Sequence, residues 1–179
     1  MQSDPALAER VWNELSPRLE SIELRSPVER AMLVKVLGQV PLRKGTQALI
    51  ELALTRQETL ESMRGRQFVL LQSANAGGVA QDELFQLWRA SEDELLRLDA
   101  IEAFSALGGV HSRELLLAVL DDPRATPIEI VYVADRLVHI GPAREVAWQL
   151  KRASLRLSEP HAREALQGIL WRWYPAPGK

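Results

Sequence analysis

Apolar residues recur every three or four positions along almost the whole chain, which is the spacing of one face of an α-helix. The first such stretch covers residues 5–22, and Pro17 interrupts it, so we expect a break near Ser16. No segment alternates apolar and polar residues between turn residues, as a half-buried strand would. The pattern therefore predicts an all-α protein of about ten helices joined by short loops, with no sheet.

Small polar residues and glycines mark the predicted helix ends. Ser26 and Thr126 each precede a proline, which predicts an N-cap followed by proline at the first helical position. Thr46 is expected to begin a shorter helix, and Gly38 is expected to end one in the left-handed conformation that glycine favours. The helix before Gly38 is predicted to bury Leu33, Val34 and Leu37. A later helix is predicted to bury a band of Leu95, Leu98, Ile101, Phe104 and Leu107.

The ends of every second helix recur at a regular distance. Gly38, Gly108 and Gly141 close the segments VLG, ALG and HIG, and Gln72 and Trp171 hold the same place in the other two cases. The spacings are 34, 36, 33 and 30 residues, a period that is typical of an α-solenoid of stacked helix pairs. We therefore expect a single domain over residues 1–174, with a flexible tail at 175–179 and five helix pairs at about 5–41, 42–76, 80–109, 111–141 and 142–174.

These helix pairs also share a weak motif. Arg30, Arg64 and Arg163 stand eight positions before the end of their units, the first and last in the contexts PVER and PHAR, whereas Ala100 and Val133 replace the arginine elsewhere. With the Leu-Gly-like endings, the chain resembles a HEAT-like repeat protein along nearly its whole length. The resemblance implies a right-handed superhelix whose second helices line a concave binding surface, and it implies no particular ligand. We assign the three arginines to structure rather than to binding.

The charge is unevenly distributed although the net charge is only −2. Residues 1–66 carry +1, residues 67–129 carry −7 and residues 130–179 carry +4. A balance this close to zero provides no general attraction to nucleic acid or to an anionic membrane. The acidic middle is either a solvated surface or a patch for a basic partner.

Several features bear on compartment and chemistry. The chain has no cysteine, no signal peptide and no run near the roughly 18 apolar residues of a membrane span, so we expect a soluble, cytoplasmic protein with no membrane insertion, unless a leader has been removed. The three histidines, His111, His139 and His161, form no metal-binding motif, and the His-Glu pair of HEAT-like hydroxylases is absent. We expect no catalytic residue, no metal and no cofactor.

One polar stripe emerges when the helix ends are aligned. Asp99 and Glu102 share one helical face, as do Asp135 and His139 on a later helix. The stripe is a solvated inner surface, an acidic groove for a basic or helical peptide, or a site of acid–base chemistry. Its remaining members are Met32, Lys35, Arg66 and Tyr132.

The five tryptophans divide into two groups. Trp12, Trp88 and Trp148 lie on first helices, where we expect them to fill the outer layer between repeats. Trp171 and Trp173 point about 200° apart on one helix, so at least one of them should be exposed, either by chance or as a docking surface or homodimer contact.

A basic run near the C-terminus suggests a different class of function. It contains Arg144, Lys151, Arg152 and Arg156, and with Trp148 and Asp135 it is similar to the basic cleft of HEAT-like DNA glycosylases. The acidic middle of the chain argues against binding to phosphates.

We expect a non-catalytic protein-interaction scaffold that binds another protein or peptide, basic if the acidic stripe is used. The predicted contact residues are Lys35, Arg66, Asp99, Glu102, Tyr132, Asp135, His139, Trp171 and Trp173. The alternatives are an enzyme or enzyme-maturation accessory that uses the acidic residues with His139, and, less favoured, a nucleic-acid-binding protein.

Overall fold

The computed structural model describes residues 4–55, 63–141 and 144–174. In this part of the chain every regular element is a helix and no strand occurs, which confirms the predicted all-α class. None of the described helices combines the length and the apolar character that crossing a bilayer requires. The expected tail at 175–179 lies outside the described residues.

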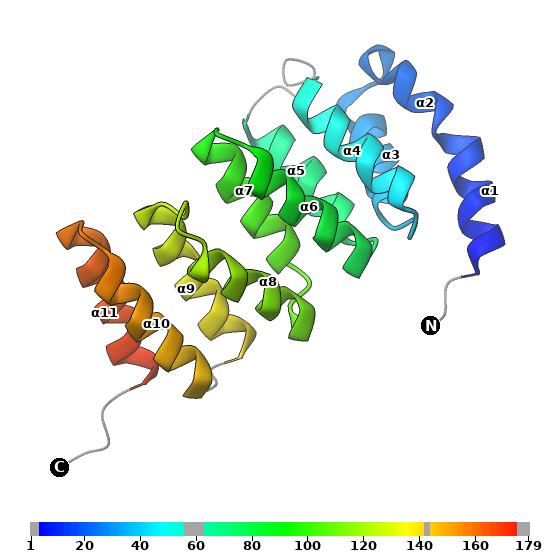
Figure 1. Cartoon of the computed structure of the whole chain (residues 1–179). Coiled ribbons are helices and arrows are strands. Elements are labelled where there is room, and N and C mark those ends of the chain that lie inside the picture. Colours follow the sequence, from blue (N-terminus) through cyan, green and yellow to red (C-terminus); the bar gives the residue numbers. More distant parts are fainter. Residues whose placement is uncertain (1–3, 56–62, 142–143, 175–179) are drawn as a thin grey trace. The chain divides into compact units, whose positions relative to one another are not determined.

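The chain divides into two compact units, residues 1–107 and 108–179. In the N-terminal unit, α3, α5 and α7 pack side by side in that order, and α4 lies beside both α5 and α6 (Figure 1). Exposed ion pairs join the outer helices: the Lys44 ammonium lies 2.6 Å from Glu9, which links α4 to α1. The helices are α1 (Pro5–Leu15), α2 (Pro17–Glu20), the 3-10 helix η1 (Ile22–Leu24), α3 (Pro27–Gly38), α4 (Arg43–Thr55), α5 (Met63–Ala74), α6 (Gly78–Ala90) and α7 (Glu94–Ser105).

The C-terminal unit has the same kind of pairing. Here α8 packs on α9 and α10 packs on α11, while α9 also contacts α11 and α8 contacts α10. The N-terminal unit likewise contains contacting neighbours along the chain, α4 with α5 and α6 with α7. The bounds of the four helices of the C-terminal unit are α8 (Gly109–Asp121), α9 (Pro127–Ile140), α10 (Arg144–Arg156) and α11 (Pro160–Trp173).

Local sequence signals account for most helix beginnings. Ser26 and Thr126 are N-caps as predicted, and each forms a capping box with the glutamate three residues later. Pro17 separates α1 from α2 at Ser16, also as predicted. The prediction for Thr46 was wrong: α4 begins at Arg43, and Thr46 is a buried residue within the helix. The earlier beginning places Gly45 against the Trp12 ring of α1.

Gly38 does not have the predicted left-handed conformation. It is the last residue of α3 and is buried, and Gln39 after it is right-handed. A Cβ atom at Gly38 would lie 2.3 Å from the carbonyl oxygen of Gln72 on α5. Glycine is therefore required for close approach of two helix backbones, whereas Gly108, with φ +67°, does need the left-handed region.

The core follows the predicted pattern only in part. Leu33, Val34 and Leu37 of α3 are buried, as predicted. In the band predicted for α7, Ile101 and Phe104 are buried but Leu95 is exposed, as is Leu107, which lies beyond the end of the helix. The packing of α7 against both α5 and α6 turns Leu96, Ala100 and Ala103 inward instead. Tertiary contacts thus rotated the buried face away from the band that sequence spacing favoured.

Candidate functional site

Helix α3 is apolar on its solvent side as well as on its core side. Val28 and Met32 are 68% and 62% exposed, and Val36, one turn further along, is also exposed. Residues four positions apart lie on the same face, so the three side chains form a continuous row. Single exposed apolar residues are normal in proteins, whereas a row of this kind is a feature to explain. We call Val28, Met32 and Val36 the α3 row.

A groove lies between the α3 row and α5. Its volume is about 380 Å³, and it is lined by Pro27, Val28, Ala31, Met32, Lys35 and Phe68. Phe68 contributes the α5 wall and remains exposed. One turn beyond it, the contact between Gly38 and Gln72 holds the two helices together, so the groove rests on a fixed helix–helix contact.

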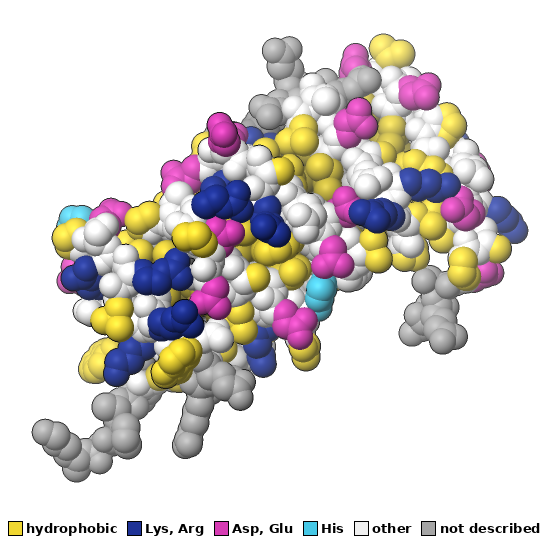
Figure 2. Space-filling model, in the orientation of Figure 1, with side chains coloured by type: hydrophobic (Ala, Val, Ile, Leu, Met, Phe, Trp, Pro, Cys, Tyr) yellow, Lys and Arg dark blue, Asp and Glu magenta, His cyan; other side chains and the backbone are white. Residues whose placement is uncertain are grey.

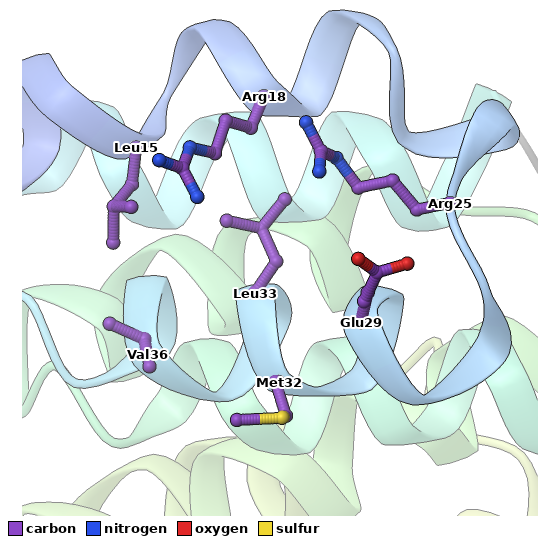
Figure 3. Close-up of a pocket in the computed structure, with 7 residues that line it drawn as sticks. All are labelled: Leu15, Arg18, Arg25, Glu29, Met32, Leu33 and Val36. Atoms are coloured by element: carbon purple, nitrogen blue, oxygen red, sulfur yellow. The ribbon is translucent and has the colours of Figure 1, made fainter.

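A second pocket lies on the opposite side of the α3 row. It has a volume of about 230 Å³ and lies between the α1–α2 segment and α3 (Figure 3). Leu33 occupies its centre, and the side chains of Arg18 and Arg25 lie above it, Arg18 toward Leu15 and Arg25 above Glu29. The remaining lining residues are Leu15, Glu29, Met32 and Val36.

The one acidic residue in this pocket is already engaged by the helix cap. Glu29 Oε2 accepts hydrogen bonds from the Ser26 backbone N–H at 2.9 Å and from the Ser26 hydroxyl at 2.8 Å. These bonds, aided by the nearby Arg25 charge, hold the pKa of Glu29 below its ordinary value of 4.5. Glu29 therefore stays ionised at neutral pH and is directed to the end of α3.

The size of the two hollows indicates what they can hold. Small-molecule sites usually enclose about 300–1,000 Å³ and bury most of the ligand. The hollows beside α3 are open to solvent and measure about 230 and 380 Å³. They fit individual side chains on either side of a ridge better than one enclosed molecule.

Three of the predicted contact residues interact with one another in the N-terminal unit. Arg66 of α5 is buried, and its Nε donates a hydrogen bond of 2.8 Å to Asp99 Oδ2 on α7. Its Nη2 lies 2.7 Å from the same oxygen, and Gln67 donates a 2.5 Å hydrogen bond to Glu102. Burial raises the pKa of Asp99 above 3.8, although Arg66 acts in the opposite direction. These residues join α5 to α7, whereas Lys35 lines the groove beside the α3 row.

The other predicted residues lie in the C-terminal unit. His139 and Asp135 are close, as predicted, with His139 Nδ1 2.6 Å from the Asp135 carbonyl oxygen and 3.6 Å from its carboxylate. The His139 ring also lies 5.6 Å from the Trp173 ring, centroid to centroid. Tyr132 stacks with the Arg136 guanidinium. Trp171 is 79% exposed and Trp173 is also exposed, which agrees with the predicted exposure at this end of the chain.

The arginines assigned to structure behave as expected where they are described. Arg30 donates a 3.0 Å hydrogen bond to the Arg25 carbonyl, and Arg163 donates to the Leu157 carbonyl at 3.1 Å. Each side chain therefore holds the segment that precedes its own helix. The Arg64 side chain lies outside the described residues.

The basic run forms an exposed surface on α10. Figure 2 shows Lys and Arg side chains on the visible face of this unit, and Lys151 and Arg152 are both exposed. Trp148 is 63% exposed beneath Arg152, so the prediction that it fills the outer layer was wrong. Trp88, by contrast, is fully buried as predicted, and Trp12 is half-buried. Arg156 donates to the carbonyls of Leu120 and Asp122, which fixes it in the packing of α10 on α8.

Within the described residues, no three histidine, aspartate or glutamate side chains are grouped as metal ligands would be. Comparison with protein-family models, curated proteins and solved structures finds no match to this chain. The HEAT-like resemblance therefore stays a prediction. Sequence analysis did include Met32 and Lys35 in its stripe, but it missed Arg18, Arg25 and Phe68.

Proposed function

We propose that this chain is a non-catalytic protein-interaction module built from HEAT-like helix pairs, and that it binds a helical segment of a partner protein on the α3 row. The observation that carries the proposal is the exposed row itself, with one apolar hollow on each side. A partner helix bound in this way would insert side chains that lie one helical turn apart into the two hollows.

The helix pairing within each unit supports the repeat architecture. In a HEAT-like stack, α3 and α5 would be second helices, and the groove between them would belong to the concave surface. Apart from Arg25, the residues that line the hollows lie on helices, so little conformational entropy is lost when a ligand binds. This favours a preformed docking surface over catalysis.

The test is a selection of helical peptides displayed on phage against the full chain. Selected peptides are then measured by fluorescence anisotropy against the wild type, a Val28→Glu/Met32→Glu double variant and a Leu155→Glu control. Leu155 is the control because it is also an exposed apolar residue, 80% exposed, and it belongs to α10 of the C-terminal unit.

The double variant should weaken peptide binding by at least about tenfold, because it introduces charge into the apolar contact. The Leu155→Glu control should bind like the wild type. Equal affinity for all three proteins, or a selection that yields no binder of the wild type, contradicts the proposal. Circular dichroism shows whether both variants remain folded.

A second candidate partner is another copy of the chain. Trp171 is 79% exposed on α11, and Trp173 beside it is partly exposed. Burying such aromatic area supplies much of the binding energy of protein interfaces. Sedimentation equilibrium should show a dimer that is lost in a Trp171→Ser/Trp173→Ser variant. A monomeric wild type, or a dimer that survives both substitutions, excludes this contact.

A further inference from the structure

Positive charges border the α3 row on both sides. Arg18 and Arg25 lie in the pocket on the α2 side, and Lys35 lies in the groove on the α5 side. Among the residues that the structure describes, none of these three cations lies within ion-pair distance of a carboxylate. Two exposed cations elsewhere in this unit differ, since Lys44 and Arg43 pair with Glu9 and Glu83.

The pocket is lined by two arginines, and in the described part of the chain one of them lacks a hydrogen-bond acceptor for its Nε atom. Figure 3 shows Arg18 and Arg25 on the same side of Leu33, with Glu29 below Arg25. Glu29 Oε2 is held by Ser26 in the cap of α3. The Nε atom of Arg25 is buried and has no hydrogen-bond acceptor within the described residues. An anion that entered the pocket would provide Arg25 with a hydrogen-bond acceptor and would interact favourably with the charge of both arginines.

We propose that the helical segment bound at the α3 row carries carboxylate side chains beside its apolar face, and that Arg18 and Arg25 bind them. This inference rests on the proposed function, and it specifies the partner as an acidic amphipathic helix. Guanidinium groups suit this role because their fork of N–H donors matches the two oxygens of a carboxylate.

The arrangement favours an acidic helix over a phosphate-rich ligand. The α3 row covers nine residues from Val28 to Val36, and its two ends are about 12 Å apart at 1.5 Å per residue, which matches about two turns of a bound helix. A nucleic acid would use the cations but would leave the apolar row uncovered. An amphipathic helix covers the α3 row with its apolar face, and acidic residues beside that face pair with the cations that border the row.

The experiment compares two versions of one peptide that the wild type selects. In one version every charged position beside the apolar face is Glu, and in the other every such position is Lys. Both are titrated by fluorescence anisotropy against the full-length wild type, an Arg18→Glu/Arg25→Glu variant and a Lys151→Glu/Arg152→Glu control. The control makes the same change of charge on α10, where both side chains are exposed.

The wild type and the α10 control should bind the Glu version at least about tenfold more tightly than the Lys version, since each contact of this kind contributes up to about fivefold. The Arg18→Glu/Arg25→Glu variant should reverse this preference. Equal affinity of the wild type for both versions overturns the inference and leaves the proposed function standing. Failure of both versions to bind overturns the proposed function as well.

A second experiment, with lipid vesicles, tests whether the arginines bind a membrane surface instead of an acidic helix. Sedimentation of the wild type with phosphatidylserine vesicles, lost in the Arg18→Glu/Arg25→Glu variant and retained by the α10 control, would assign the arginines to a membrane surface and overturn the inference. Absence of sedimentation, together with the charge preference for the Glu peptide, supports it.

Discussion

Gly38 of α3 and Gln72 of α5 are in backbone contact. A Cβ atom at Gly38 would lie 2.3 Å from the carbonyl oxygen of Gln72 and 2.7 Å from its carbonyl carbon. Gly38 is the last residue of α3, and Gln72 lies in the last turn of α5. The contact fixes α3 against α5 one turn beyond Phe68, the residue that forms the far wall of the groove.

We predict that Gly38→Ala lowers the free energy of unfolding by at least about 1–3 kcal/mol, because the added methyl group meets backbone that cannot rotate away. Urea denaturation followed by circular dichroism measures the change. Gly168→Ala is the matched control: it is also a helical glycine, and nothing lies within 4 Å of its added Cβ. The control should be stabilised by about 0.5–1 kcal/mol. A Gly38→Ala protein as stable as the wild type would show that the helices do not approach this closely.

Removing one partner of the ion pair between Arg66 and Asp99 should destabilise the folded protein, because it leaves the other partner without its counter-charge. We expect Arg66→Met to lower the free energy of unfolding by about 2–3 kcal/mol, somewhat less than the about 3–5 kcal/mol of a fully buried pair, because Asp99 keeps partial contact with solvent. Arg43→Met is the control, since Arg43 is largely exposed in its pair with Glu83 and should change stability by less than about 1 kcal/mol. Equal losses in the two variants would contradict the buried pair.

The pKa of the Asp99 carboxyl group should reflect its burial. Its pKa lies above 3.8 because burial disfavours the charged form, and Arg66 limits that rise. The folded state thus holds this proton more tightly than the unfolded state, so the carboxyl group's contribution to stability is complete below pH 3.8 and is lost as pH rises through the raised pKa. Carboxyl carbon NMR titration should give a still higher pKa in Arg66→Met. A lower pKa of Asp99 in Arg66→Met would contradict the conclusion that Arg66 stabilises the charged form of this carboxyl group.

The capping box at the beginning of α9 provides a test in the C-terminal unit. The Thr126 backbone N–H donates a 2.7 Å hydrogen bond to Glu129, and the Thr126 hydroxyl accepts from the Glu129 N–H. Thr126→Ala should therefore lower the free energy of unfolding by about 1 kcal/mol, whereas Thr126→Ser should retain most of the wild-type value. Thermal unfolding measures both. A serine variant that loses as much as the alanine variant would assign the effect to packing rather than to the cap.

Features that depend on neighbouring residues in the chain were predicted well. Ser26 and Thr126 were identified as caps, and Pro17 as a break, because capping and proline chemistry act within one helical turn. Close proximity of Asp135 and His139 was also predictable, since residues four apart share a helical face.

Features that depend on contacts between helices were predicted less well. Thr46 was assigned to a helix beginning, but contact of Gly45 with Trp12 places it inside α4. Trp148 was assigned to the interior because tryptophan usually supplies buried area, yet it is exposed with Arg152 stacked on it. Periodicity shows which residues share a face, but it does not show which of two apolar faces another helix will cover.

The α3 helix illustrates the same division at the candidate site. Its sequence by itself determined the cap at Ser26 and the core residues Leu33, Val34 and Leu37. Only the tertiary structure decided that Val28 and Met32 remain exposed on the other side of the helix and that Arg18 and Arg25 border them. The reason is physical: local chemistry forms the helix, whereas exposure and charge proximity arise from segments that are brought together by folding.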